Sequence, residues 1–254
     1  MARERLDKAL VARGLAPSRE RARSLLMAGA VVVDGQPQAK AGTLIRPEAT
    51  IRLTHEPQPY VSRGGLKLER ALDFFHIDAR AKAVMDVGAS TGGFTDCLLQ
   101  RGAWRIYAVD VGYGQLAWRL QQDPRVINLQ RRNIRYLRWE EVGEEVDLAV
   151  VDTSFISLTL VIPHTLTFLR QGGGLLALIK PQFEVGKGEV GKGGVVRDPE
   201  KHRQVVERIV RFAESQGLIT RGVTESPIQG PKGNKEFFLY CERPHGKDRG
   251  TEAG

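Results

Sequence analysis

Four lysine and carboxylate residues lie at or near the ends of apolar runs, where a folded sheet would bring them together. Asp152 closes VDLAVVD, Lys180 closes LLALIK and Glu236 opens EFFLYCE. Lys67 belongs to SRGGLKLERAL, a segment with helical spacing that precedes the first apolar run. Paired amines and carboxylates can take up a proton and orient reacting groups. A surface ion pair would explain each residue singly, but four of them around one sheet edge predict a catalytic site.

A glycine-rich turn is expected beside this site. The string VMDVGASTGGFTD covers residues 84–96, and a later apolar run ends on Asp110. Its glycines let the backbone approach a ligand at the start of a helix, where free amide groups point outward. These glycines are Gly88, Gly92 and Gly93. A tight strand-to-helix turn would also need them, but Asp86 and Asp110 on strand ends favour a nucleotide-like cofactor.

The type of cofactor stays open on these residues alone. Asp110 could hold the ribose of NAD or of S-adenosylmethionine equally well. Ser90 replaces the middle glycine of the dinucleotide fingerprint G-x-G-x-x-G, which weakens the case for NAD. A second string, GKGEVGKG, ends on Gly193 where a P-loop needs serine or threonine, so we exclude an NTPase. We expect residues 185–196 to form a mobile, basic flap beside the site.

The apolar runs alternate with helix-like segments, which predicts a doubly wound, mostly parallel α/β sheet of the Rossmann type. The expected strands are Ala83–Val87, Arg105–Val109, Val126–Leu129, Val146–Val151 and Leu175–Ile179. The expected helices are Gly92–Gln100, Gln115–Gln121, Ser157–Leu169 and Pro199–Ser215. Two further runs, Leu218–Thr224 and Glu236–Glu242, are joined without a helix, so they should pair antiparallel at one edge. A parallel sheet with such a hairpin resembles the methyltransferase version of this architecture.

Residues 1–53 predict a separate small α+β unit. Its expected elements are helices over Leu6–Ala12 and Arg19–Ala28, with Ser18 as N-cap, and strands over Ala30–Gln36, turning at Asp34-Gly35, and Ala49–Leu53. Basic residues outnumber acidic ones in its first half. Guanidinium groups along a helix face match phosphate oxygens, so we expect RNA binding here rather than a merely solvated face. The candidates are Arg3, Arg5, Lys8, Arg19, Arg21 and Arg23.

Composition narrows the class of protein. The 254 residues are 41% hydrophobic, enough for a core without disulfides, and the two cysteines lie inside apolar runs. We see no leader pattern and no apolar run long enough to span a bilayer. These features predict a cytoplasmic protein without a membrane partner. The net charge of +8 then points to another polyanion, for which nucleic acid is the natural candidate.

The chain resembles two known families. The string RLDKALVARGLAPSRERARSLLMAGAVVVDGQPQAKAGTLI is similar to the small RNA-binding domain first seen in ribosomal protein S-four. Nearly the whole chain resembles the TlyA family of haemolysin-named ribosomal RNA methyltransferases, whose catalytic domain is of the FtsJ type. The matching strings are YVSRGGLKL, DVGASTGGFTD, VDTSFISL, IKPQFEVGK and GNKEFFLY. We therefore expect an RNA-binding domain over 1–53, a linker over 54–61, a methyltransferase domain over 62–243 and a disordered tail over 244–254.

The resemblance also implies roles for single residues. Lys67, Asp152, Lys180 and Glu236 would form the family's catalytic tetrad. The residues that would hold S-adenosylmethionine are Asp86, Gly88, Ser90, Gly92, Gly93, Phe94, Asp110, Asn133 and Asp152. For Asn133 a loop cap is an equal alternative. The implied activity is 2′-O-methylation of ribosomal RNA, with cytidine suggested by the family, on naked rRNA or on ribosomal subunits.

The implied reaction makes demands on these residues. A 2′-hydroxyl must lose its proton while it attacks a sulfonium methyl group in line. Our hypothesis is that Lys180 is the base, that Asp152 and Glu236 orient it, and that the second cation, Lys67, tunes it. This displacement needs no metal, and the histidines and cysteines do not cluster with ligand spacing.

Two aromatic residues flank the predicted catalytic strand ends. Phe155 and Phe183 could stack on a nucleobase turned out of an RNA helix, but for at least one of them we favour core packing. Two other functions compete with the enzyme: a non-catalytic rRNA-binding or ribosome-assembly factor, and a membrane-lytic protein of the kind that the family's older name suggests. The intact tetrad argues against the first, and the lack of an insertable segment argues against the second.

Overall fold

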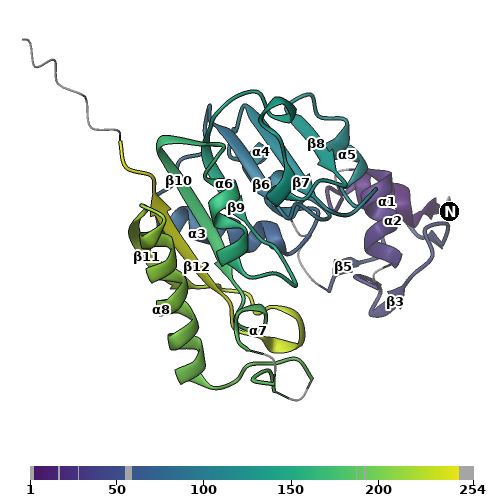
Figure 1. Ribbon diagram of the computed structural model, residues 1–254. Coiled ribbons are helices and arrows are strands. Elements are labelled where there is room, and N and C mark those ends of the chain that lie inside the picture. The colour runs from purple at the N-terminus through teal and green to yellow at the C-terminus, as the bar shows by residue number, and fades with distance from the viewer. Residues whose placement is uncertain are drawn as a thin grey trace, which may run out of the picture. The chain divides into compact units, whose positions relative to one another are not determined.

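The chain forms two compact units in the computed structural model, Met1–Pro59 and Tyr60–Gly254. The structure describes residues 3–16, 18–27, 29–54, 59–186, 188–191 and 193–245. Half of the predicted linker, residues 55–58, lies outside the described residues, as does the predicted tail from residue 246 onward. Figure 1 draws the elements of both units.

The larger unit is built on a 7-stranded sheet with the order β11-β12-β10-β9-β6-β7-β8. The strands are β6 (Ala83–Val87), β7 (Arg105–Asp110), β8 (Val126–Gln130), β9 (Val146–Val151), β10 (Leu169–Ile179), β11 (Ile219–Glu225) and β12 (Phe237–Glu242). Strands β6 to β10 are parallel, whereas β12 runs antiparallel to both β10 and β11. The prediction of a mostly parallel, Rossmann-like sheet with an antiparallel pair at one edge is confirmed.

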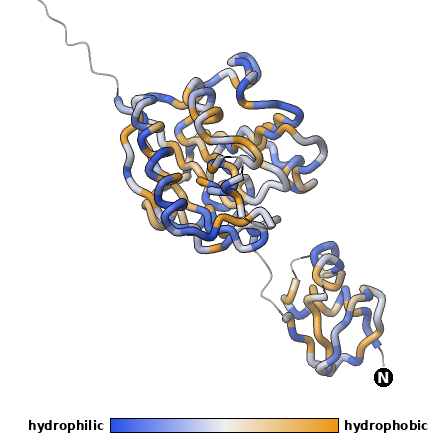
Figure 2. Tube along the Cα trace, turned by 60° about the horizontal axis from the view of Figure 1, so that its bottom comes forward, coloured by the Kyte–Doolittle hydropathy of each residue, from blue (hydrophilic) through white to orange (hydrophobic). Residues whose placement is uncertain are grey.

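Both faces of this sheet are covered by helices. Alternate strand residues such as Val84 and Ile106 share a core with α3, α4 and α5, while their neighbours Met85 and Tyr107 share a core with α6 and α8. The helices are α3 (Gly64–Phe74), α4 (Gly93–Gln100), α5 (Trp118–Gln121), α6 (Ile162–Thr165), α7 (Pro181–Glu184) and α8 (Pro199–Ser215). Burial on both faces explains why the strands read as continuous apolar runs. Figure 2 shows these hydrophobic stretches within the larger unit.

Two predicted helices of this unit are wrong in extent. Ser157–Leu169 was expected as one helix, but the structure has a short η3 (Leu158–Leu160), then α6, and Leu169 already belongs to β10. Pro163 is in the first turn of α6 and has no amide hydrogen, so it begins a new helix instead of continuing the previous turn. The helix expected over Gln115–Gln121 is reduced to α5, because Ala117 is extended and acts as its N-cap.

The smaller unit joins two helices to short strands. Its elements are β1 (Glu4–Arg5), α1 (Leu6–Ala12), α2 (Arg19–Met27), β2 (Val31–Val33), β3 (Gln36–Gln38), β4 (Leu44–Ile45) and β5 (Ile51–Leu53). The backbone amide of Arg21 donates to Ser18 Oγ at 3.2 Å, which confirms the predicted N-cap. Asp34 and Gly35 both have positive φ, as the predicted tight turn between β2 and β3 requires. Ala28, the predicted last residue of the second helix, lies outside the described residues.

Candidate active site

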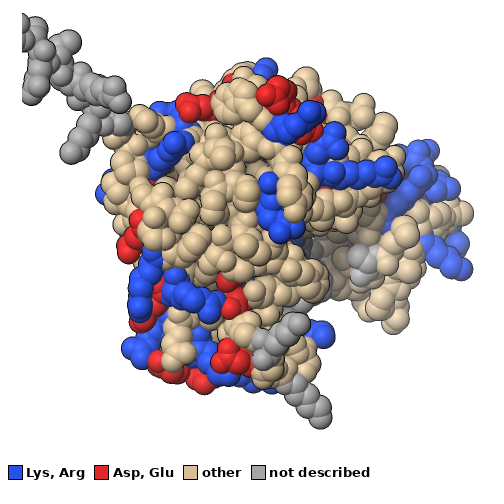
Figure 3. Space-filling view, in the orientation of Figure 1, with Lys and Arg blue, Asp and Glu red and all other residues tan. Residues whose placement is uncertain are grey.

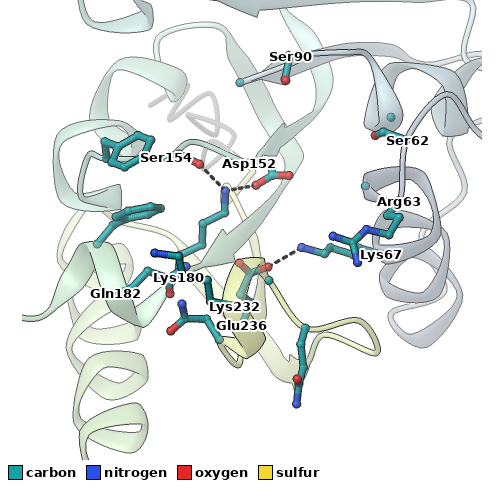
Figure 4. A pocket seen from close by; sticks show the side chains of 18 of the residues that line it. Ser62, Arg63, Lys67, Ser90, Asp152, Ser154, Lys180, Gln182, Lys232 and Glu236 are labelled. Carbon is teal, nitrogen blue, oxygen red and sulfur yellow. Dashed lines mark hydrogen bonds and ion pairs between the residues drawn. The ribbon is translucent and has the colours of Figure 1, made fainter. Parts of the chain in front are cut away.

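The four residues of the predicted tetrad line one cavity of about 710 Å³ in the larger unit. Lys67 comes from α3, Asp152 follows β9 and Lys180 follows β10. Glu236 directly precedes β12, and because that strand is antiparallel its start lies at the carboxyl edge of the parallel strands. Figure 4 shows the four side chains converging from these separate elements.

The tetrad is organised as two lysine–carboxylate pairs. Lys180 Nζ lies 2.6 Å from Asp152 Oδ1, and Lys67 Nζ lies 2.6 Å from Glu236 Oε2. Each lysine side chain is only 11% exposed, and that of Glu236 is fully buried. Dashed lines in Figure 4 mark both pairs. Each cation therefore has its own anion, and such burial is tolerable because the charges are matched.

Lys180 has a second partner that the sequence reasoning missed. Its Nζ donates to Ser154 Oγ at 2.9 Å in addition to pairing with Asp152. The contact with Asp152 is an ion pair by distance, whereas the contact with Ser154 is a hydrogen bond, and all three residues line the cavity. Asp152 and Ser154 together therefore set the direction in which Lys180 can meet a ligand.

Glu236 presents an oxygen that has no partner among the residues described. Its Oε2 accepts from Lys67, whereas Oε1 is buried without a hydrogen bond. A Cβ placed on Gly230 would lie 2.0 Å from this oxygen, so the loop before β12 packs tightly on the carboxylate and needs glycine there. This oxygen is itself buried against the Gly230 loop, so the structure does not present it to the cavity.

In the glycine turn, residues 88–93, the backbone passes close to neighbouring atoms, as the glycines in its sequence predicted. Gly88 has a φ of +91°, and a Cβ there would lie 2.5 Å from the carbonyl oxygen of Asp152. Gly92 has a φ of +95° and is the N-cap of α4. Gly88, Ser90, Gly93 and Phe94 line the cavity, whereas Gly92 faces Leu120 behind the turn.

Asp110 braces this turn from the end of β7. Its carboxylate accepts from the backbone amides of Ser90, at 2.8 Å, and Gly112, at 2.7 Å. It also lines a second cavity of about 460 Å³, which shares Gly88, Ser90 and Asp152 with the first. The two cavities thus meet at the glycine turn.

Asn133 has the cap geometry that was one of its two alternatives. Its Oδ1 accepts from the backbone amide of Arg135 at 3.1 Å and caps η1 (Ile134–Tyr136). The same residue lines the second cavity. The cap therefore does not remove it from the candidate cofactor site.

Asp86 lies beneath the glycine turn and lines neither cavity. It is fully buried, and its Oδ2 accepts from the Thr95 hydroxyl at 2.6 Å. Burial, with the Asp152 and Asp110 charges nearby, raises the pKa of Asp86 from 3.8 to about 7. The structure thus places this predicted cofactor residue as a support of the turn and not on the cavity wall.

The two aromatic residues near the tetrad form a pair at the first cavity. The ring centroids of Phe155 and Phe183 are 4.7 Å apart, and Phe155 is 89% exposed. Phe155 also has a positive φ of 64°, a conformation that is rare for a bulky residue. Core packing, the alternative considered for these residues, does not hold for Phe155.

Two anchoring residues around the cavity were also missed. Glu184 accepts from the Ser157 hydroxyl, at 2.7 Å, and the Leu158 amide, at 2.8 Å, which ties α7 to η3. Asn234 accepts from the Val196 amide and donates to the Gly194 carbonyl, which anchors the end of the predicted flap. These residues occur in or beside the strings that carry the family resemblance, but their types alone do not separate them from surface polar residues.

The predicted RNA-binding residues lie on the smaller unit. Arg3 and Lys8 are exposed and Arg21 is half-buried. The other three, Arg5, Arg19 and Arg23, turn toward one acid, Asp7. Figure 3 shows lysine and arginine side chains gathered on this unit.

Searches for two other kinds of site gave negative results. In the part of the chain that the structure describes, His, Cys, Asp and Glu side chains form no group of three or more able to hold a metal ion. The helices within that part also include none with the length and hydropathy of a membrane span.

Comparison with known proteins identifies both units. The family model described as FtsJ-like methyltransferase matches residues 60–243, and the S4 domain model matches residues 4–51. A relative from Mycobacterium tuberculosis, named 16S/23S rRNA (cytidine-2′-O)-methyltransferase TlyA, is 47% identical over 94% of this chain and 89% of its own length. Hemolysin A of Brachyspira hyodysenteriae is 37% identical over 93% of this chain and 98% of its own.

A solved structure agrees with these sequence matches. The structure of a hemolysin-named protein from Streptococcus thermophilus has a TM-score of 0.74 and 42% identity, covering 96% of this chain and 90% of that one. The family model spans more than half of the chain, and the TlyA and hemolysin relatives cover nearly all of it. The chain belongs to the FtsJ-like methyltransferase family, within the TlyA group of proteins that join an S4 domain to the methyltransferase domain.

Proposed function

We propose that this protein methylates the ribose 2′-hydroxyl of a cytidine in ribosomal RNA with S-adenosylmethionine as donor. The name of the Mycobacterium tuberculosis relative supports the substrate. The observation that carries the proposal is the presence of two buried lysine–carboxylate pairs in one cavity beside the glycine turn. An RNA-binding assembly factor would have no need to keep these charges together in a cavity, since burial costs desolvation energy.

The two cavities fit the shape of the proposed donor. Asp110 and Asn133 in the second cavity offer acceptor and amide groups for a ribose and a base. Gly88 and Asp152, common to both cavities, would hold the part that joins the nucleoside to the amino acid. When bound, S-adenosylmethionine supplies an electrophilic methyl group with a good leaving group.

The tetrad side chains and Ser154 would supply proton removal and alignment of the substrate. Lys180, in its neutral form, takes the proton from the 2′-hydroxyl, while Asp152 pairs with its amine and Ser154 accepts a hydrogen bond from it. The Lys67–Glu236 pair lines the same cavity and holds a second amine beside the proposed reaction. Alignment and proton removal are then both supplied by residues already in place.

Phe155 is suited to hold the target nucleotide. The ribose of a nucleotide stacked inside an RNA helix cannot reach the buried amine of Lys180 unless that nucleotide leaves the stack. The exposed ring of Phe155, backed by Phe183, offers a stacking surface for the displaced base. The cytoplasmic location stays a prediction. Naked rRNA and a ribosomal subunit stay alternative substrates, which the following test separates.

The test is transfer of a labelled methyl group from S-adenosylmethionine to naked rRNA and to purified ribosomal subunits. We expect label on one of these substrates with the unmodified protein, and a loss on the order of 10²- to 10⁴-fold with Lys180→Ala. Binding of S-adenosylmethionine to the variant should stay within a few-fold. Undiminished transfer by Lys180→Ala would overturn the role of Lys180, and cofactor binding without label on any RNA would favour the assembly factor.

A further inference from the structure

Three arginines of the smaller unit converge on a single buried carboxylate. Arg5 donates to both oxygens of Asp7, from Nε at 3.0 Å and from Nη2 at 3.2 Å. Arg19 Nη2 donates to Asp7 Oδ2 at 2.9 Å, and Arg23 Nε lies 3.8 Å from the same oxygen. The Asp7 side chain is 0% exposed. We call Arg5, Arg19 and Arg23 the arginine cluster.

The cluster is assembled from three elements by their local folding. Arg5 ends β1, Asp7 lies in the first turn of α1, and Arg19 and Arg23 are one turn apart on α2. The backbone amide of Asp7 donates to the carbonyl of Ala41 at 3.1 Å, which fixes the start of α1. Asp7 is therefore held by the fold, and the arginines are held by Asp7.

The guanidinium groups keep most of their capacity for another ligand. Arg5, Arg19 and Arg23 are 42%, 49% and 56% exposed, in contrast to the buried acid beneath them. Each guanidinium has five N–H donors, and Arg5 uses two and Arg19 one on Asp7. Three positive charges against one negative charge leave the cluster with a net charge of +2 at neutral pH.

We infer that Asp7 is the positioning residue of a preformed phosphate-binding site, which presents the arginine cluster to the backbone of the RNA substrate. The inference rests on the proposed function, in which the smaller unit binds rRNA. Long arginine side chains lose rotamer freedom when they bind, and a shared buried anchor removes part of that loss in advance. The hydrogen bonds from Arg5 and Arg19 also lower the pKa of Asp7, so the anchor keeps its charge at neutral pH.

This role and simple electrostatics predict opposite changes in RNA affinity when Asp7 is replaced by a neutral residue. Removing a negative charge from a phosphate-binding surface should strengthen RNA binding if Asp7 only reduced the net charge. If Asp7 organises the arginines, its removal should weaken binding although the net charge becomes more positive. The sign of the change therefore decides between the two roles.

The test compares full-length unmodified protein with Asp7→Asn and with Glu20→Gln, using naked rRNA as the probe. Glu20 is an exposed acid in the first turn of α2, so its substitution removes the same charge without touching the cluster. We expect Asp7→Asn to bind about 5- to 10-fold more weakly, and Glu20→Gln to bind as tightly as the unmodified protein or more tightly. Equal or tighter binding by Asp7→Asn would overturn the inference.

A second variant keeps the test decisive if Asp7→Asn fails to fold, which circular dichroism and thermal unfolding would show. Arg19→Lys keeps the charge but loses the planar fork, and Arg52→Lys makes the same change at an exposed position on β5. We expect several-fold weaker binding from Arg19→Lys and no change from Arg52→Lys; equal binding by the two would overturn the inference. Failure of the unmodified protein to bind rRNA would instead contradict the proposed function.

Discussion

The arginine cluster and the candidate active-site cavity both contain buried carboxylates, but they combine charge in opposite ways. In the smaller unit one carboxylate, Asp7, holds three half-exposed arginines, so positive charge is left over for a polyanion. In the tetrad each lysine has its own carboxylate and both lysines are 11% exposed, so the four charges cancel. The comparison teaches that the arginine cluster keeps surplus charge at the surface, whereas the tetrad keeps balanced charge largely away from water.

The largest expected effect comes from breaking one balanced pair. Glu236→Gln leaves the Lys67 ammonium buried without an anion, which should lower the free energy of unfolding by about 3 to 5 kcal/mol and abolish methyl transfer. Denaturant titration and the methyl-transfer assay measure the two effects.

Glu225→Gln is the matched control for this change. Glu225 pairs with Lys235 at 3.1 Å next to the same strand, but both side chains are 48% exposed. Loss of this exposed ion pair in Glu225→Gln should change the free energy of unfolding by less than about 1 kcal/mol. Equal destabilisation by the two variants would show that burial does not distinguish the pairs.

A further buried carboxylate, Asp86, sharpens the comparison because the charges that act on it are those of other carboxylates, Asp152 and Asp110. Its pKa is raised from 3.8 to about 7, so between these values the folded protein keeps a proton that the unfolded chain has released. The free energy of unfolding should therefore fall as pH rises through this window, by up to about 1.4 kcal/mol per pH unit. Asp86→Asn carries no titrating group at this position.

Thermal unfolding of both proteins from pH 5 to pH 8 tests this expectation. The stability of Asp86→Asn relative to the unmodified protein should rise with pH up to about 7 and then level off. A difference that stays constant with pH would mean that Asp86 is ionised in the folded protein throughout this range.

The smallest expected effect concerns Ser154, the neutral partner of the proposed catalytic lysine, Lys180. Ser154→Ala removes one of the two acceptors that direct Lys180, and we expect roughly 10-fold slower turnover with cofactor binding within a few-fold. Ser154→Thr keeps the hydroxyl and should recover most of the rate. Turnover by Ser154→Ala equal to that of the unmodified protein would mean that Asp152 alone orients Lys180.

The sheet was predictable from the sequence, whereas some helices were not. Strands buried on both faces leave continuous apolar runs, which is why Val146–Val151 was recognised as β9. The segment 157–169 has apolar residues at helical spacing, yet Pro163 divides it and the chain enters β10 at Leu169. The spacing of apolar residues alone could not show that this segment divides into two short helices and the start of a strand.

The members of the candidate site were predictable, but their pairing was not. Polar residues that end apolar runs, such as Asp152 and Lys180, indicate the carboxyl edge of a parallel sheet. The antiparallel pairing of β12 with β11 was predicted, but which lysine meets which carboxylate also depends on β12 lying next to β10 and on how α3 packs, and neither contact has a local signal. Ser154 was missed because a hydroxyl residue three positions after a strand has no pattern that separates it from an ordinary loop residue.

Analysis of the nucleosides in treated rRNA is the most direct test of the central claim. Naked rRNA and ribosomal subunits from cells lacking this protein would be incubated with S-adenosylmethionine and either the unmodified protein or Lys180→Ala, digested, and examined by mass spectrometry. We predict 2′-O-methylcytidine with the unmodified protein and none above background with Lys180→Ala. A methyl group on a base, or 2′-O-methylcytidine formed equally by both proteins, would contradict ribose methylation by this lysine–carboxylate site.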